Sequence, residues 1–521
     1  MTVYALMKHQ VEGVKFLETV DGIGALLWDP GVGKTGATLA WVDQKLAPRY
    51  GEVRVLVVAP LTAADTWVLQ PPDFMDSVVK ARFLQGSTVS IMGKIRAAHD
   101  WDMVPHAPIG VNHRGANHNA RVTILSVSAG AISSFCDERA KTIKMLRAVR
   151  AYAPHLIVVD ESHIIKGAEA NISKAMYQMG QLAPHRMILT GTVNPHSILD
   201  CYGQWRFLAP WTFSDDYGKP WTKQPLRMSL MRRKSIKPWS FGVFRDRYTT
   251  KGGYRGKDVR GYLEHGDFRA RIAERSHVMR LDDAMDLPPE KDVDIHVTLS
   301  PRERKAYTEM HNDLAALLAS GELIEAPNAL AKIMKLRQIT AGFIRDTDTE
   351  VTHVIGSSKR KAMCEIATVQ LGGEQRVVLF GYFKSECALL AQRLAQMEPS
   401  TCVEVITGAT SGKDRLDIRQ RFGDVSRNPG RMILVAQART MSVSVNELVT
   451  AQHAVYGSYS ERRNDWVQAR GRFRRKGQTK PVTHWNVFVP GSIDQVMLDR
   501  HKDRGNLEKA LLDHIRNSLR L

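Results

Sequence analysis

Two adjacent carboxylates, Asp160 and Glu161, directly follow a run of four apolar residues in the stretch HLIVVDESHII. Neighbouring carboxylates repel each other, and at the end of a buried strand they are costly unless a positive group lies beside them. We therefore expect another part of the chain to bring a positive partner to this point.

A glycine-rich segment near the start of the chain has the features of a phosphate site. The sequence LLWDPGVGKTGATLAW runs from apolar residues into a helical pattern. Gly31 and Gly33 would let the backbone wrap a phosphate, with amides directed at it from the start of a helix. Lys34 would then reach the terminal phosphates, and Thr35 would be a ligand of Mg²⁺. A glycine-rich turn with a surface lysine is the simpler alternative.

The order of these two patterns along the chain predicts what the carboxylates do. Asp160 would hold the Mg²⁺ that accompanies ATP, and Glu161 would orient and deprotonate an attacking water. The positive partner of both carboxylates is then the metal ion. A solvated acidic turn is the alternative, and the presence of both patterns in this order makes it the weaker one.

Two further elements could serve the same site. Thr190 and Thr192 flank Gly191 after an apolar run, where small hydroxyl groups could relay the state of the terminal phosphate. Arg472 and Arg475 are three residues apart in DWVQARGRFRRKGQ, which predicts that they share one face of a helix. Arginines brought to ATP from elsewhere stabilise charge on a transferring phosphoryl group. A basic helix that faces DNA or solvent is the alternative.

The composition narrows the class of protein. The chain has 521 residues and is 43% hydrophobic, enough for about two or three domains. Its net charge of +19 favours a polyanionic partner, most often nucleic acid. We expect no membrane span and no secretion signal, because no long apolar run occurs and MTVYALMKHQ lacks a basic stretch before an apolar one. The five cysteines lack pairing or zinc-ligand spacing, so they suggest thiols in a reducing, cytoplasmic compartment.

Short apolar runs alternate with helical patterns in both halves of the chain. Such runs suit strands buried on both faces, which predicts an α/β fold with parallel sheets covered by helices. The expected strands are 52–60, 121–126, 155–160 and 186–192 in the first half, and 376–382, 401–407, 431–437, 453–458 and 482–489 in the second. A capping box predicts that a helix begins after Ser300, and another helix is expected at 385–397.

The predicted domains follow from where this alternation stops. Residues 1–210 form the first lobe, 211–285 a basic insertion or linker region poor in strand pattern, and 286–521 the second lobe with a C-terminal helix. The join is placed at MDLPPEKDV, where two prolines interrupt regular structure.

Taken together, these motifs resemble the superfamily II helicases, and among them the Swi/Snf family of DNA-translocating ATPases, over nearly the whole chain. The segments that carry the resemblance are LMKHQVEGVKFL, DPGVGKT, VLVVAPLTAADTW, DESH, LTGT, LPPEKDVDIHVTLSPRERKAY and QARGRFRRKGQ. The resemblance implies two RecA-like lobes, an adenine-reading Gln10, and Gln468, Arg472 and Arg475 facing the nucleotide. The segment SVSVNEL resembles the family's motif V, but Ser442 and Ser444 stand where the family usually carries glycine.

The expected function is an ATP-dependent translocase or helicase on duplex or branched DNA, acting in recombination, repair or replication. It would use ATP and Mg²⁺ in the cytoplasm of a bacterium or a phage-infected host cell. The motor of a restriction-type system, an RNA helicase and a DNA-binding protein without ATPase activity are the alternatives.

A basic segment after LTGT, which resembles motif III of the family, is the candidate DNA contact. It contains Arg232, Arg233 and Lys234, followed by more cations and by interleaved aromatic residues. Such density predicts phosphate contacts along a groove, with the aromatic side chains packing or stacking.

Overall fold

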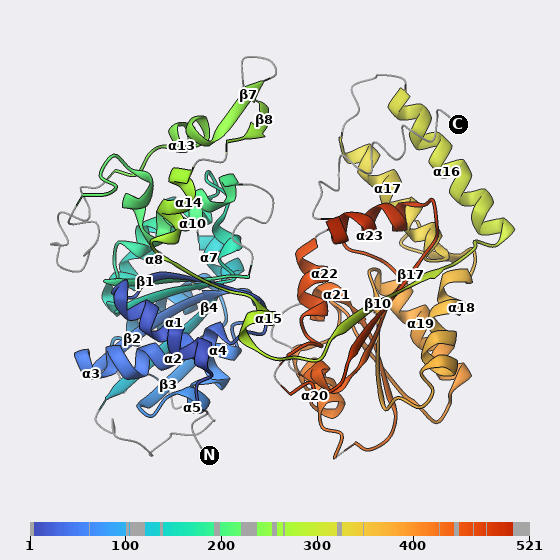
Figure 1. Cartoon of the computed structure of the whole chain (residues 1–521), viewed down its shortest axis with the longest axis horizontal. Coiled ribbons are helices and arrows are strands. Elements are labelled where there is room, and N and C mark those ends of the chain that lie inside the picture. The colour runs from blue at the N-terminus through green and yellow to red at the C-terminus, as the bar shows by residue number, and fades with distance from the viewer. Residues whose placement is uncertain are drawn as a thin grey trace. The chain divides into compact units, whose positions relative to one another are not determined.

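The computed structural model describes residues 5–503 apart from 62, 101–103, 105–119, 136–138, 192–197, 220–236, 253–257, 264–265, 320–325, 347–348, 427, 442–446, 462 and 476. The chain divides into two compact units, Met1–Met285 and Asp286–Leu521 (Figure 1). The boundary between them lies in the predicted join.

The first unit is built on a seven-stranded parallel sheet with the order β3-β4-β2-β5-β6-β1-β9. The strands are β1 (Ile23–Trp28), β2 (Glu52–Ala59), β3 (Val78–Leu84), β4 (Arg121–Ser128), β5 (Leu156–Asp160), β6 (His185–Leu189) and β9 (Ser276–Met279). Its central strands are fully buried because they are apolar on both faces.

The helices of the first unit follow the strands in the order that a parallel sheet requires. They are α1 (Lys8–Thr19), α2 (Lys34–Trp41), α3 (Ala47–Tyr50), α4 (Thr66–Leu69), α5 (Pro71–Phe74), α6 (Thr88–Ala97), α7 (Ala129–Phe135), α8 (Arg139–Tyr152), α9 (Asn171–Gly180), α10 (Cys201–Leu208), α13 (Phe241–Tyr248), α14 (Gly266–Ala273) and α15 (Leu281–Ala284). Helices α1 and α2 pack against each other beside the sheet (Figure 1). An antiparallel hairpin, β7 (Thr249–Gly252) with β8 (Asp258–Tyr262), follows α13.

The second unit repeats the plan with a six-stranded parallel sheet of order β10-β17-β16-β13-β15-β14. The strands are β10 (Glu290–His296), β13 (Arg376–Gly381), β14 (Cys402–Ile406), β15 (Met432–Gln437), β16 (His453–Tyr456) and β17 (Val482–Phe488). A small antiparallel pair, β11 (Phe343–Arg345) and β12 (Thr352–Val354), lies between β10 and β13 in the chain.

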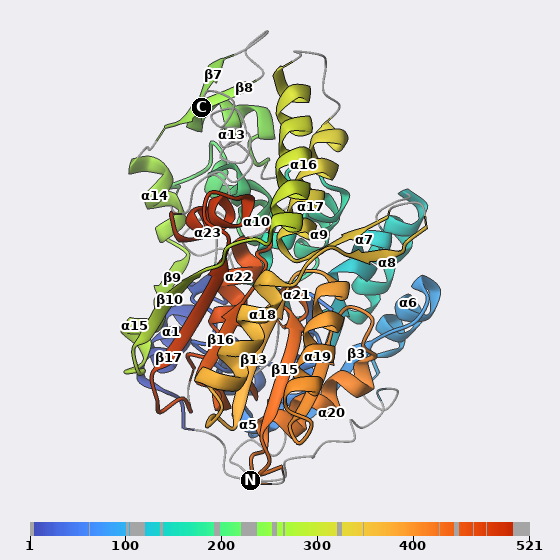
Figure 2. The same cartoon turned by 90° about the vertical axis from the view of Figure 1, so that its right-hand side faces the viewer.

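The helices of the second unit cover both faces of its sheet. They are α16 (Pro301–Ala319), α17 (Ala326–Thr340), α18 (Ser358–Glu365), α19 (Lys384–Met397), α20 (Gly412–Gly423), α21 (Ala438–Met441), α22 (Arg463–Arg470) and α23 (Ile493–Asp503). Helices α18 and α19 pack on one face, as Figure 2 shows, whereas buried side chains of α20, α22 and α23 belong to the core on the other.

The predicted α/β fold with two parallel sheets is confirmed, and so are the predicted strands and the helix after Ser300. Its capping box forms: the Ser300 amide donates to Glu303 Oε2 at 2.9 Å. The strands that the sequence did not predict include β3, β9 and β10, which lie at sheet edges. An edge strand has one free side and tolerates charged residues, so EKDVDIH in β10 lacks a continuous apolar run.

The segment 211–285, predicted to be an insertion or linker, lies within the first unit. Its strand β9 pairs with β1. Its side chains Phe213, Phe244, Tyr248 and Phe268 pack together in the core of that unit. The described aromatic residues of this segment therefore hold it to the fold. None of the described helices is long and apolar enough to cross a membrane.

Candidate active site

The loop between β1 and α2 has the backbone that the phosphate pattern predicts. Gly31 and Gly33 adopt φ values of 92° and 88°, a conformation that glycine enters without steric cost. Helix α2 begins at Lys34, directly after Gly33. Its first amides are therefore available to an anion at this end, as in other helix-start phosphate sites.

Two buried side chains of α1 hold this loop. The Gln10 amide nitrogen donates to the Gly33 carbonyl at 3.2 Å, while its oxygen accepts from the Met7 amide at 3.0 Å. His9 Nε2 lies 2.8 Å from the Val32 carbonyl oxygen. Gln10 is thus placed at the loop by its contacts, and adenine reading by this residue stays a prediction.

The ammonium group of Lys34 lies over the same loop. Its Nζ donates to the carbonyl oxygens of Trp28 at 2.8 Å and Asp29 at 3.3 Å. Lys34 is buried at 9% exposure, and Thr35 follows it on the first turn of α2. A buried cation beside backbone amides is suited to a phosphate group.

Asp160 ends β5 and is buried, and both of its carboxylate oxygens accept hydrogen bonds. Its Oδ2 accepts a hydrogen bond from Trp67 Nε1 at 3.0 Å, and its Oδ1 accepts from the Glu161 amide at 2.9 Å. Burial, with the nearby Glu161 charge, raises the pKa of Asp160 to about 6, although Trp67 and Lys34 act in the opposite direction. Asp160 lies opposite Leu189 of β6, and Leu189 lies opposite Leu26 of β1, so the strand that leads to the phosphate loop and the carboxylate end at the same edge of the sheet.

Glu161 adopts an unusual backbone conformation at the strand end. Its φ is 49° and its ψ is 55°, in the left-handed region that residues other than glycine seldom enter. One carboxylate oxygen lies 3.4 Å from His163 Nδ1. Glu161 thus follows Asp160 in a tight turn at the end of β5, and its role as a water-activating base stays a prediction.

The third predicted element packs on the phosphate loop. Thr190 is buried, and its amide donates to the Leu26 carbonyl at 3.2 Å. A Cβ added at Gly191 would lie 2.9 Å from Pro30 Cδ and 3.2 Å from the Trp28 carbonyl oxygen. A side chain at position 191 would thus push on the loop. Thr192, which was predicted to act together with Thr190, lies outside the described residues.

These groups fit Mg²⁺ with a nucleotide. Mg²⁺ prefers oxygen ligands and is usually held by one or two carboxylates plus phosphates and water. The described part of the chain has no group of three His, Cys, Asp or Glu side chains placed to hold a metal. The buried Asp160, with its raised pKa, is a carboxylate that a cation would stabilise. Asp160 and Thr35 are the residues that would hold the ion.

In the second unit, the predicted arginines do not share a helical face. Helix α22 ends at Arg470, so Arg472 and Arg475 lie in the turns after it. Arg472 is buried, and Arg475 Nε donates to the Gly471 carbonyl at 2.8 Å. The guanidinium of Arg470, the last residue of the helix, donates to Asp292 on β10 at 2.6 and 3.0 Å. Gln468 lies in the last turn of α22, and a nucleotide role for these residues stays a prediction.

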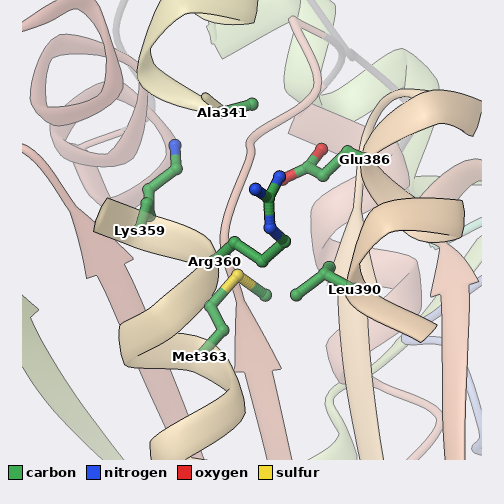
Figure 3. A pocket seen from close by; sticks show the side chains of 6 residues that line it. All are labelled: Ala341, Lys359, Arg360, Met363, Glu386 and Leu390. Atoms are coloured by element: carbon green, nitrogen blue, oxygen red, sulfur yellow. The ribbon is translucent and has the colours of Figure 1, made fainter. Parts of the chain in front are cut away.

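A small pocket between α18 and α19 involves other residues. Figure 3 shows its lining side chains, Ala341, Lys359, Arg360, Met363, Glu386 and Leu390. Lys359 Nζ lies 2.6 Å from Asp494 Oδ2, and Glu386 Oε1 accepts from Ser458 Oγ at 2.7 Å. None of the predicted site residues lines this pocket, and its charged groups hold helices together.

Two supporting residues were not predicted as part of the site. Trp67 binds Asp160, and Gln204 of α10 accepts a hydrogen bond from Ser162 at 2.6 Å, directly after the carboxylates. Their motifs were recognised, but no pattern in the sequence indicated these contacts. The predicted DNA contacts Arg232, Arg233 and Lys234, with Ser442 and Ser444 of motif V, lie outside the described residues.

Comparison with known proteins places the chain in a family. The model of the SNF2-related domain matches residues 9–342. The ATP-dependent DNA helicase DDM1 of Arabidopsis thaliana is 21% identical, over 97% of this chain and 62% of the relative. The human TATA-binding protein-associated factor 172 is 21% identical, over 99% of this chain and 28% of the relative. An uncharacterized ATP-dependent helicase of Mycoplasma genitalium is 23% identical, over 69% of this chain and 31% of the relative.

Among solved structures, the chain is similar to the SWI2/SNF2 ATPase core of Sulfolobus solfataricus, determined in complex with double-stranded DNA. The match has 18% identity and a TM-score of 0.36, and it covers 98% of this chain and 95% of the other. The chain spans less than a third of the length of two of the relatives above. The match over residues 9–342 shows that the chain belongs to the SNF2-related, or Swi/Snf, family of superfamily II.

Proposed function

We propose that this chain is a DNA-dependent ATPase that moves along duplex or branched DNA in recombination, repair or replication. The observation that carries the proposal is that the end of β5, with Asp160, and the end of β1, which leads to Lys34, lie at one edge of the first sheet with only β6 between them. The carboxyl ends of parallel strands are where α/β proteins bind ligands. Family membership supports the same function.

Each candidate site residue of the first unit has a definite task in this proposal. The loop amides and Lys34 bind and orient the phosphates, and Thr35 and Asp160 would hold Mg²⁺. The metal supplies positive charge that stabilises the transferring phosphoryl group. Glu161 accepts a proton from the attacking water, and Thr190 contacts the strand that leads into the phosphate loop. From the second unit, we propose that Gln468, Arg472 and Arg475 act on the same nucleotide.

The direct test is the ATPase rate with duplex DNA, single-stranded DNA or RNA added. Stimulation by duplex DNA at least as strong as by single strands supports the proposal. Stimulation by RNA alone would instead identify an RNA helicase. A chain that binds DNA but hydrolyses no ATP would be the non-enzymatic alternative.

We further propose that the motor tracks along an intact duplex. Between residues 374 and 489, every described strand is a parallel member of the sheet, and the described residues form no protruding hairpin there that could split a duplex. Displacement of the third strand of a triplex should therefore need ATP and be efficient, while a tailed duplex stays paired. Processive unwinding of a long tailed duplex without triplex displacement would contradict this.

The basic segment is the proposed grip on DNA. One of its described cations, Arg247, binds Asp267 at 3.1 Å and lies over Trp239, so that residue has structural partners. The proposal therefore rests on Arg232, Arg233 and Lys234. Neutralising the three together should weaken binding on all sequences alike and flatten its salt dependence, whereas an unaltered salt slope would exclude this segment as the grip.

A further inference from the structure

Trp67 ends the segment VLVVAPLTAADTW, which carries part of the resemblance but none of the predicted site residues. It is in α4, which follows β2, and it is fully buried. Strand β2 pairs with β5, with Val58 opposite Val159. The chain that leaves β2 thus passes the end of β5, where Asp160 lies. This explains how residues 93 positions apart meet.

The contact holds the carboxylate in one orientation. Trp67 Nε1 donates to Oδ2 at 3.0 Å, and the Glu161 amide donates to Oδ1 at 2.9 Å. Rotation of the carboxylate would break both hydrogen bonds. Each oxygen can accept more than one hydrogen bond or ligand, so the two contacts leave acceptor capacity for a cation.

A plain structural reason would be that a buried indole needs an acceptor. Trp205 of α10 shows that this need does not fully explain the bond from Trp67 to Asp160. It is equally buried, and its Nε1 has no hydrogen-bond partner among the described residues. The first unit therefore tolerates a buried indole without an acceptor, and the bond made by Trp67 benefits the carboxylate.

From this geometry we infer that Trp67 is a positioning residue, which fixes the Asp160 carboxylate in the orientation that binds Mg²⁺ with the nucleotide. The inference rests on the proposed function. Trp67 itself touches neither nucleotide nor metal in this role. It acts through Asp160, so its effect should appear only when the metal is present.

The test compares the binding of fluorescently labelled ADP in Mg²⁺ and in EDTA. Trp67→Phe removes the indole N–H and keeps an aromatic ring. It should weaken binding about tenfold in Mg²⁺, as expected for loss of a hydrogen bond to a charged group, and leave binding in EDTA unchanged. Trp205→Phe makes the same chemical change without loss of a hydrogen bond, so it should bind as the unaltered protein does in both conditions.

Two further variants keep the outcome decisive. Asp160→Asn should lose the gain from Mg²⁺, and adding Trp67→Phe to it should cause no further loss. If Trp67→Phe fails to fold, site-specific replacement of Trp67 by benzothienylalanine keeps the bicyclic shape without the N–H.

The outcomes separate the inference from the function on which it rests. If Asp160→Asn loses the Mg²⁺ gain but removal of the N–H does not, the role of Trp67 is wrong. Equal weakening in Mg²⁺ and EDTA would also overturn it, because Trp67 would then support the loop in general. If Asp160→Asn keeps the full Mg²⁺ gain, the proposed metal site itself is wrong.

Discussion

The parallel sheet of the first unit ends in a buried carboxylate, Asp160, whose pKa is raised, whereas Asp494 and the more exposed Asp292 of the second unit are paired with cations. Asp160 has indole and amide donors but no ion-pair partner within salt-bridge distance among the described residues. In the second unit, Asp494 pairs with Lys359 at 2.6 Å, and both side chains are at most 3% exposed. Asp292 binds Arg470 through two hydrogen bonds.

The pKa values follow this difference. Burial acts to raise the pKa of Asp292, but the hydrogen bonds and charge of Arg470, together with Asn486, lower it overall. Burial dominates at Asp160 and its pKa rises. A buried carboxylate with a raised pKa is typical of a functional site, while a fully paired one is typical of architecture. This contrast predicts a functional role for Asp160 and a structural one for Asp494.

The largest expected effect concerns the carboxylate next to Asp160. Glu161→Gln should lower kcat by up to about 10⁴-fold, because the water loses its base. Nucleotide affinity should stay the same, since the loop, Lys34 and Asp160 remain. Steady-state ATPase rates and binding of labelled ADP measure the two quantities. Full turnover in this variant would remove Glu161 from the mechanism.

The second prediction concerns the arginines of the other unit. Arg472→Ala and Arg475→Ala should each lower kcat on the order of 10³-fold, as for arginines that stabilise phosphoryl transfer, with little change in nucleotide affinity. Arg304→Ala is the control, because it removes one exposed positive charge from α16. Unchanged rates for both site variants would leave these arginines a structural or DNA-facing role.

The third prediction tests the comparison of carboxylates through stability. Asp494→Asn leaves the buried Lys359 without its counter-charge and should lower the free energy of unfolding by about 3–5 kcal/mol. Asp160→Asn should change it by only about 1 kcal/mol, because no ion pair is lost. Urea unfolding followed by circular dichroism measures both. Equal destabilisation by the two substitutions would contradict the distinction between the paired Asp494 and the unpaired Asp160.

The smallest expected effect is a loss of stability at acidic pH, to which a buried histidine of each unit should contribute. Burial is the main cause that lowers the pKa of His155 in the first unit and His501 in the second from 6.5 to about 4. Below about pH 6.5 the unfolded chain takes up protons that the folded chain does not. Stability should therefore be complete above that pH and be lost as the pH falls towards 4.

Urea unfolding at pH 7 and pH 5 measures this dependence. His155→Asn and His501→Asn should each reduce the loss of stability between the two pH values. His99→Asn, at an exposed position, should leave it unaltered. An unchanged pH dependence in both buried variants would show that other groups control acid unfolding.

The sequence by itself determined the central strands apart from β1, and the order of the motifs. Apolar runs such as LIVVD are recognisable because a strand buried on both faces must be apolar throughout, and the glycines of GVGKT reflect a local backbone requirement. These signals are complete within a few residues. The candidate roles of Lys34, Asp160 and Glu161 could therefore be inferred before the fold was known.

Tertiary structure alone decided which groups hold those residues in place. The edge strands β3, β9 and β10 lack a continuous apolar run, which an edge position tolerates, although the edge strand β14 was predicted from its sequence. The end of α22 at Arg470, which separates Arg472 and Arg475 from the helix, coincides with an ion pair to β10 across the sheet. The bond from Trp67 to Asp160 joins residues 93 positions apart. Such contacts depend on which strands lie side by side, and that depends on the packing of the whole sheet.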